Sequence, residues 1–120
     1  NAADVGYVNA HATSTPAGDR SEVLALHSVF TSSGARPRVS STKALTGHGL
    51  SLAGAMEAAF CTLALSEGFI PGAAHLEEPD PVCDGLDLPP TSLEEAPRLA
   101  LNNSSGFGGS NVCHLLRRPA

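Results

Sequence analysis

The stretch that decides the fold is Lys43-Ala44-Leu45-Thr46-Gly47-His48-Gly49, together with the apolar run from Leu50 to Leu65 that follows it. Within this run Glu57 is the only charged residue, and small residues alternate with large apolar ones. Apolar side chains fall on every face of a helix with about 3.6 residues per turn. The run therefore predicts a central helix that is buried almost all round, around which the rest of the chain is organised.

The polar residues at the entrance to this helix suggest chemistry. A carboxylate at Glu57 has to be paired or neutralised, because an isolated buried charge is strongly unfavourable, and Lys43 is the nearest cation in the sequence. We expect His48 in or just before the first helical turn, where the helix dipole disfavours an imidazolium. A neutral histidine there can donate a hydrogen bond to a developing anion. Taken alone, the segment is better explained by a histidine that merely caps a helix.

Length and composition restrict the class of protein. A chain of 120 residues forms one domain or part of one. Its net charge of −5 and isoelectric point of about 5.4 argue against nucleic acid or an anionic membrane as a partner. The run from Leu50 to Leu65 is short for a membrane span and contains Glu57. Because the only methionine is Met56 and the sequence begins at Asn1, we expect it to be part of a larger protein.

The order of predicted elements indicates an α/β fold. A helix is expected from about Asp19 to Ser33-Gly34, with Asp19 and Glu22 capping and solvating it rather than acting as acids. This helix and the central one alternate with strands, which predicts a parallel sheet with helices on its faces. The acidic, proline-rich segment from Pro79 to Pro97 is expected to be a surface excursion. The four predicted strands are Val5–Ala10, Arg38–Thr42, Leu99–Asn103 and Val112–Leu116.

Two loops carry candidate site residues. His11 and the hydroxyl residues after it follow the first predicted strand, where α/β folds place their sites. The glycine-rich loop from Ser104 to Asn111 precedes a strand and has no lysine after it, so it fits neither a dinucleotide fingerprint nor a P-loop. We expect a tight turn whose backbone N–H groups approach a ligand and can form an oxyanion hole.

Three segments together resemble a known family. Tyr7–Asp19, Ser41–His48 and Asn103–Asn111 are similar, in order and spacing, to the carboxy-terminal half of β-ketoacyl-[acyl-carrier-protein] synthases. The elongating enzymes of the type I/II group are the nearest resemblance, followed by polyketide ketosynthases. The resemblance implies an α/β, thiolase-like fold with helix-sheet-helix-sheet-helix layers. Residues 1–120 would be its second half, and the amino-terminal half with the nucleophilic cysteine would be absent.

The resemblance also implies an activity and a set of site residues. It is the decarboxylative Claisen condensation of an acyl thioester with malonyl carrier protein, in fatty-acid or polyketide biosynthesis. His11 and His48 correspond to the two histidines whose neutral rings hold the malonyl carbonyl as it becomes an enolate. The resemblance assigns supporting roles to Lys43 and Glu57. Phe107 would be an acyl gate whose backbone N–H joins the oxyanion hole. The hydroxyls of Thr13 and Thr15 would lie along the phosphopantetheine arm.

The sequence departs from the family pattern at several positions. Ala12 replaces the glycine usual after the first histidine, and Ser105 replaces the phenylalanine usual before Gly106, which leaves the acyl chain length open. None of Cys61, Cys83 and Cys113 lies in the family's cysteine motif. Their odd number and the lack of a CxxC spacing indicate the reduced thiols of a cytoplasmic protein, not a disulfide or zinc framework.

The expected partners follow from the same resemblance. They are an acyl carrier protein bearing acyl and malonyl groups, the missing amino-terminal half, and a second copy of the complete enzyme. The phosphopantetheine arrives on the carrier, and we expect no cofactor or metal of the chain's own, because the five histidines lack ligand spacing. The fragment alone is expected to be inactive. The alternatives are a non-catalytic partner like a chain-length factor and an isolated structural domain; retention of both histidines and the lysine counts against them.

Overall fold

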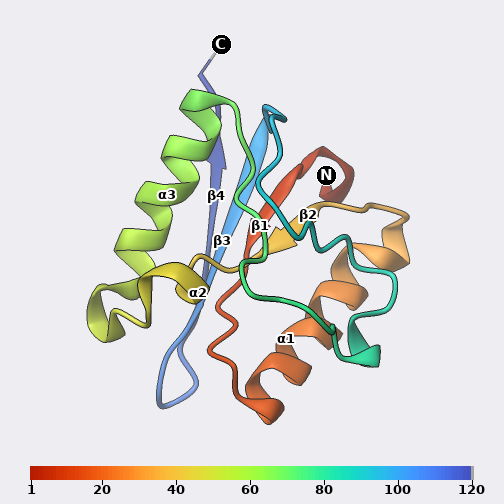
Figure 1. Ribbon diagram of the computed structural model, residues 1–120, viewed down its shortest axis with the longest axis vertical. Coiled ribbons are helices and arrows are strands. Elements are labelled where there is room, and N and C mark those ends of the chain that lie inside the picture. Colours follow the sequence, from red (N-terminus) through yellow and green to blue (C-terminus); the bar gives the residue numbers. More distant parts are fainter. Residues whose placement is uncertain (120) are drawn as a thin grey trace.

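A four-stranded sheet with the strand order β2-β1-β3-β4 forms the centre of the computed structural model, which describes residues 1–119 (Figure 1). Strand β1 (Tyr7–Asn9) pairs in parallel with β2 (Arg38–Ser40) and with β3 (Leu99–Ser105). Strand β4 (Asn111–Arg117) is antiparallel to β3, to which the glycine-rich turn joins it. The predicted parallel sheet is confirmed for three strands, and the glycine-rich loop is the predicted turn.

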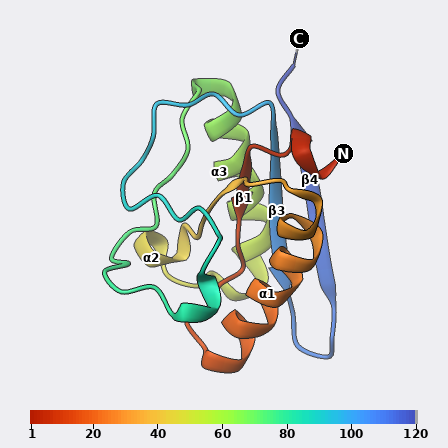
Figure 2. The same ribbon diagram turned by 90° about the vertical axis from the view of Figure 1, so that its right-hand side faces the viewer.

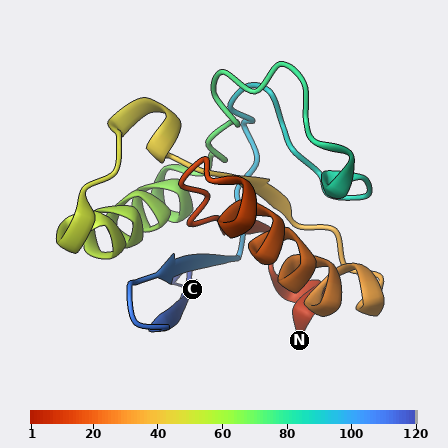
Figure 3. The same cartoon turned by 90° about the horizontal axis from the view of Figure 1, so that it is seen from below.

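Three α-helices surround this sheet, and its two faces carry separate hydrophobic clusters (Figures 2 and 3). Val8 packs with Leu26 and Phe30 on the α1 side, whereas Tyr7 packs with Cys61 on the α3 side. Successive strand residues point to opposite faces, so adjacent residues of β1 anchor the two layers. The helices are α1 (Pro16–Val29), α2 (Lys43–Thr46) and α3 (Ala53–Glu67), and the short 3₁₀ turns are Ala2–Asp4, Thr31–Ser33, Leu50–Leu52 and Pro81–Cys83.

Helix α1 begins earlier than the sequence predicts. It starts at Pro16 rather than near Asp19, with Thr15 extended immediately before it. Proline suits the first helical position because its missing N–H has no partner there and its φ is already helical. Asp19 Oδ1 accepts a hydrogen bond from the Thr15 N–H at 3.3 Å, so Asp19 reaches back from inside the helix.

The expectation that the central helix is buried all round is wrong for the described residues. The buried side chains of α3 lie on one face, with Glu57 and Cys61 at its centre. Leu50 is 71 % exposed, and Leu52 and Leu63 are also exposed, because within residues 1–119 only one side of α3 packs against the sheet. By length and composition the stretch Leu50–Glu67 is long and apolar enough to cross a membrane. The prediction that the run beginning at Leu50 is too short for a membrane span is therefore wrong. The core helix of a soluble protein passes the same test.

The acidic segment from Pro79 to Pro97 runs over the surface as predicted, and it protects the edge of the sheet. The Val39 N–H donates to the Asp87 carbonyl at 2.8 Å, and Arg38 forms ion pairs with Asp87 and Glu95. These two acidic partners raise the pKa of Arg38. The segment therefore pairs with a backbone N–H that β2 would otherwise expose at its free side.

Candidate functional site

The two histidines singled out from the sequence lie side by side. His11 follows β1 and His48 follows α2, and their ring centroids are 5.5 Å apart with the ring planes at 86°. Both line a cavity of about 360 Å³ between the start of α3 and the β3–β4 turn. The elements that form it meet at the lower end of the sheet in Figure 1, beyond the carboxyl ends of the parallel strands. Polar side chains that converge there form a candidate active site.

Backbone geometry orients His48. The preceding Gly47 has φ 73° and ψ −179°, a region that essentially only glycine occupies. After the turn, the Leu50 N–H donates a hydrogen bond to His48 Nδ1 at 3.2 Å. A nitrogen that accepts carries no proton, so the proton of the neutral ring lies on Nε2, which is free to donate. Helix α3 begins only at Ala53, so His48 lies outside its first turn.

Glu22 holds the loop that carries His11. Its Oε1 accepts the His11 N–H and its Oε2 accepts the Ala12 N–H, both at 2.8 Å, while Oε1 also accepts Asn103 Nδ2 at 2.6 Å. The expectation that Glu22 only solvates its helix is therefore wrong. A carboxylate accepting several hydrogen bonds fixes the loop, in which Ala12 takes a left-handed φ of 27°. No local sequence pattern reveals this role, because the bonded groups come from three different elements.

Burial lowers the pKa of His11, and the positive charge of Lys43 lowers it further, while Glu22 partly opposes the change. His11 is therefore neutral at pH 7. Its Nδ1 is buried and has no hydrogen-bond partner among residues 1–119. The cavity thus contains a neutral imidazole at His11 and, at His48, a ring whose Nδ1 already accepts a hydrogen bond. Hydrogen-bond donors placed in this way suit the stabilisation of an anion that forms during a reaction rather than one already present.

A buried ion pair lies behind the histidines. Glu57 is fully buried, Lys43 is nearly so, and Lys43 Nζ contacts Glu57 Oε1. The structure thus pairs the single charge of the run from Leu50 to Leu65 with the nearest cation in the sequence. Thr42, next to Lys43, donates its N–H to Asn9 Oδ1 at 3.3 Å, which ties the start of α2 to the end of β1. The position of the lysine is therefore fixed from both sides.

The remaining predicted site residues are placed differently. The hydroxyls of Thr13 and Thr15 are 3.3 Å apart in the loop before α1, with Thr15 exposed. Phe107 is fully exposed in the β3–β4 turn and does not line the cavity. Its roles as a gate and oxyanion donor therefore stay predictions. His114 also lines the cavity, although we did not select it from the sequence. It pairs opposite Asn102 in the sheet, and this register places its side chain on the cavity face.

Among the described residues, no cysteine lines this cavity. Burial raises the pKa of the Cys61 thiol to about 12, so it is protonated and inert. Cys113 is exposed on β4 and donates to Asn103 Oδ1 at 3.1 Å. Among residues 1–119 no three histidine, cysteine or carboxylate side chains are grouped to hold a metal ion. The described residues therefore offer proton donors and an ion pair, but no cysteine thiol at the site.

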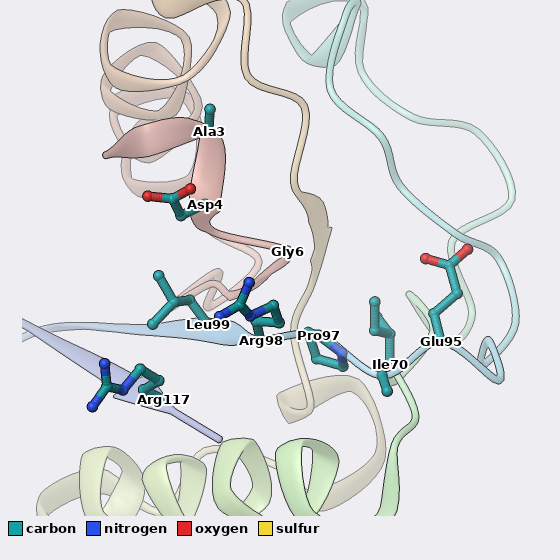
Figure 4. Close-up of a pocket in the computed structure, with 10 residues that line it drawn as sticks. Ala3, Asp4, Gly6, Ile70, Glu95, Pro97, Arg98, Leu99 and Arg117 are labelled. Carbon is teal, nitrogen blue, oxygen red and sulfur yellow. The ribbon is translucent and has the colours of Figure 1, made fainter. Parts of the chain in front are cut away.

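A larger cavity of about 590 Å³ lies at the other end of the sheet (Figure 4). It contains Arg98 and Arg117 together with Asp4 and Glu95, between the start of β3 and the end of β4. Oppositely charged side chains line it, and no histidine or thiol does. We therefore place the candidate chemistry at the smaller cavity.

Comparison with known proteins identifies close similarity to one group. Residues 1–77 match the family described as "Beta-ketoacyl synthase, C-terminal domain". The chain is 44 % identical over 110 residues to 3-oxoacyl-[acyl-carrier-protein] synthase 2 of Staphylococcus aureus, covering 91 % of the chain and 27 % of the relative. It is 39 % identical over 114 residues to 3-oxoacyl-[acyl-carrier-protein] synthase 1 of Escherichia coli, covering 95 % and 28 %.

Solved structures agree with this similarity. The ishigamide ketosynthase/chain length factor superposes with a TM-score of 0.91 at 33 % identity, covering 100 % of the chain and 29 % of that protein. A type II polyketide acyl-carrier protein in complex with its ketosynthase bound to the hexaketide gives a TM-score of 0.91 at 29 % identity, with the same coverage. The chain therefore spans less than a third of each of these relatives.

Proposed function

Because the chain belongs to the β-ketoacyl synthase family through its C-terminal domain, we propose that it supplies the two histidines and the lysine of a condensing enzyme. That enzyme would join an acyl thioester to malonyl carrier protein. Since the chain spans only 27–28 % of its curated relatives, the proposal assigns the nucleophilic cysteine to an amino-terminal half outside these residues. The chain by itself would be inactive.

The observation that carries the proposal is the pair of imidazoles that line one cavity. In the proposed reaction the bond between the malonyl C2 and its carboxylate breaks, carbon dioxide leaves, and the electron pair forms an enolate. The Nε2–H of His48 and the ring of His11 can both donate to the enolate oxygen, since the two ring centroids are 5.5 Å apart. C2 then attacks the acyl thioester, forming a carbon–carbon bond and releasing the cysteine thiolate. Neutral donors favour the anion that forms over the carboxylate that is lost.

Lys43 and Glu57 fit a supporting role in this scheme. The lysine lies close enough to lower the pKa of His11, and the glutamate neutralises the lysine in the interior. The lysine therefore helps to keep His11 neutral during turnover. Phe107 would act as the acyl gate, and Thr13 and Thr15 would contact the phosphopantetheine arm.

The proposed partners are an acyl carrier protein bearing acyl and malonyl groups, the missing half and a second copy of the complete enzyme. One similar structure contains an acyl-carrier protein with its ketosynthase, which supports the first of these. The exposed leucines Leu50 and Leu52 of the 3₁₀ turn and Leu63 of α3 offer an apolar face for the missing half. The phosphopantetheine would arrive on the carrier, no further cofactor is proposed, and the cytoplasm is the proposed location.

The test uses the complete protein and malonyl carrier protein. We expect His48→Ala to lower the rate of malonyl decarboxylation by roughly a hundredfold to a thousandfold, because one donor to the enolate is lost. His75→Asn is the matched control; His75 lies outside the cavity and has a left-handed φ of 63°, which asparagine tolerates. Release of carbon dioxide is measured for both variants. An unchanged rate in His48→Ala would refute the role of His48.

A second candidate is a non-catalytic subunit like a chain-length factor. The similarity to a structure titled ketosynthase/chain length factor favours considering it. A subunit without catalysis does not need the His48 geometry or a buried lysine, so we prefer the enzyme. The residue at the nucleophile position of the complete protein discriminates between them, since a residue other than cysteine would favour the subunit.

A further inference from the structure

The cavity at His11 and His48 contains polar groups that the proposed chemistry does not use. Ser104, Ser105 and Ser110 from the β3–β4 hairpin line it together with His114 of β4. We propose that this hydrogen-bonding wall selects an acyl chain that carries hydroxyl or keto oxygens over a saturated alkyl chain. The inference rests on the proposed function and specifies its acyl substrate.

Strand register places His114 on the cavity side of the sheet. Residues directly opposite in an antiparallel pair point to the same face, and His114 is opposite Asn102. Asn102 donates its side-chain N–H to the Gly54 carbonyl of α3 at 3.1 Å, which identifies this face as the one covered by α3. The imidazole of His114 therefore lies on the same face as the start of α3, where the cavity is.

Ser104 provides a hydroxyl that lacks a partner. Its Oγ is buried and makes no hydrogen bond with residues 1–119. It lies against Gly54, where an added Cβ would be 3.1 Å from Oγ, so the close approach depends on the glycine. A buried hydroxyl without a partner is unfavourable, and rotation about χ1 can turn it toward a ligand oxygen. A ligand that satisfies it gains a bond that an alkyl chain cannot make.

The rest of the lining suits the carbon backbone of such a chain. Leu50, Ala53, Ala55 and Val112 supply apolar surface in the same cavity. Methylene groups can pack on this surface while oxygens face the hydroxyls and the imidazole. Each net hydrogen bond favours the oxygenated chain by roughly threefold to tenfold. Discrimination increases further where the alkyl analogue leaves buried polar groups unpaired.

Binding measurements test the inference without turnover. The probes are octanoyl-pantetheine and 3-hydroxyoctanoyl-pantetheine in which an amide replaces the thioester, so that neither can acylate a cysteine. We expect the complete protein to bind the hydroxylated probe about tenfold more tightly by calorimetry. His114→Leu and Ser104→Ala should each reduce this ratio toward one, whereas His114→Gln, which retains hydrogen-bonding groups, should preserve it. Circular dichroism of each variant confirms folding.

Two results would overturn the inference: equal or tighter binding of the octanoyl probe by the wild-type protein, or an unchanged ratio in a folded His114→Leu variant. Malonyl decarboxylation by the same preparation tests the proposed function separately. A protein that decarboxylates but binds both probes equally contradicts only the substrate preference. A protein that prefers the hydroxylated probe without decarboxylating contradicts only the condensing activity.

Discussion

The histidine end of the sheet and the free side of β2 are held in opposite ways. At the histidine end the chain uses a buried charge pair, Lys43 and Glu57, and left-handed backbone at Ala12, Gly47 and Leu50. Along β2, the acidic segment is held by Arg38 through partly exposed ion pairs and ordinary backbone hydrogen bonds. Strain and buried charge are thus concentrated where the candidate chemistry lies. The comparison predicts large effects at the first region and small ones at the second.

The largest effect on stability is expected from separating the buried pair. Lys43→Met leaves Glu57 buried without its cation and should cost about 3–5 kcal/mol of unfolding free energy in the complete protein. The double variant Lys43→Met with Glu57→Leu removes both charges and should recover most of that loss. Urea denaturation measures both variants. A double variant as unstable as the single one would show that the charge pair itself, rather than the unpaired carboxylate, determines stability.

The turn before His48 should come next. Gly47→Ala introduces a Cβ into a backbone region that only glycine occupies, at a cost of roughly 1–3 kcal/mol. No atom lies within 4 Å of the added Cβ, so the cost arises from the backbone and not from a clash. Gly34→Ala is the matched control, because it also has open space around it but has φ 75° and ψ 6°, which other residues tolerate better. Equal losses of stability and decarboxylation in the two variants would contradict the special role of Gly47.

A smaller effect is expected on the pH dependence of decarboxylation. His11 has a lowered pKa, so its neutral form persists as the pH falls below the ordinary value of 6.5. The acid limb of the rate profile should therefore have its midpoint below pH 6.5. Glu22 raises the pKa of His11 and Lys43 lowers it, so Glu22→Gln should move the midpoint down and Lys43→Met should move it up. Shifts in the same direction would show that the limb reports another group.

The smallest effect belongs to the β2 side. The Arg38 guanidinium lowers the pKa of Glu95 below its ordinary value of 4.5, so this pair stabilises the fold above pH 4.5 and the contribution is lost as the pH falls through the lowered pKa. Glu95→Gln should change the urea midpoint less than either variant above, and high salt should remove the difference. A loss comparable to that of Lys43→Met would refute the contrast between the two regions.

Local sequence patterns predicted most of the helices and strands, but not the contacts that these elements make with one another. The strands, the hairpin and the central helix follow from apolar runs and glycine positions. Helix α1 begins earlier than predicted because Pro16 already fits a first helical turn. The pairing of His11 with His48 was expected from the family resemblance, and the structure brings their rings together. The carboxylate of Glu22 was misjudged because its partners, His11, Ala12 and Asn103, are distant from it in the sequence.

By itself the sequence determined the α/β class, the family, and the residue types that can stabilise an enolate, because periodicity and motif spacing are local properties of the chain. Only the tertiary structure decided that His48 presents Nε2, that Glu22 fixes the His11 loop, that α3 buries one face, and that Phe107 lies outside the cavity. These features depend on contacts between elements that are far apart in the sequence. Hydrogen-bond direction and burial are set by such neighbours, and no run of adjacent residues contains that information.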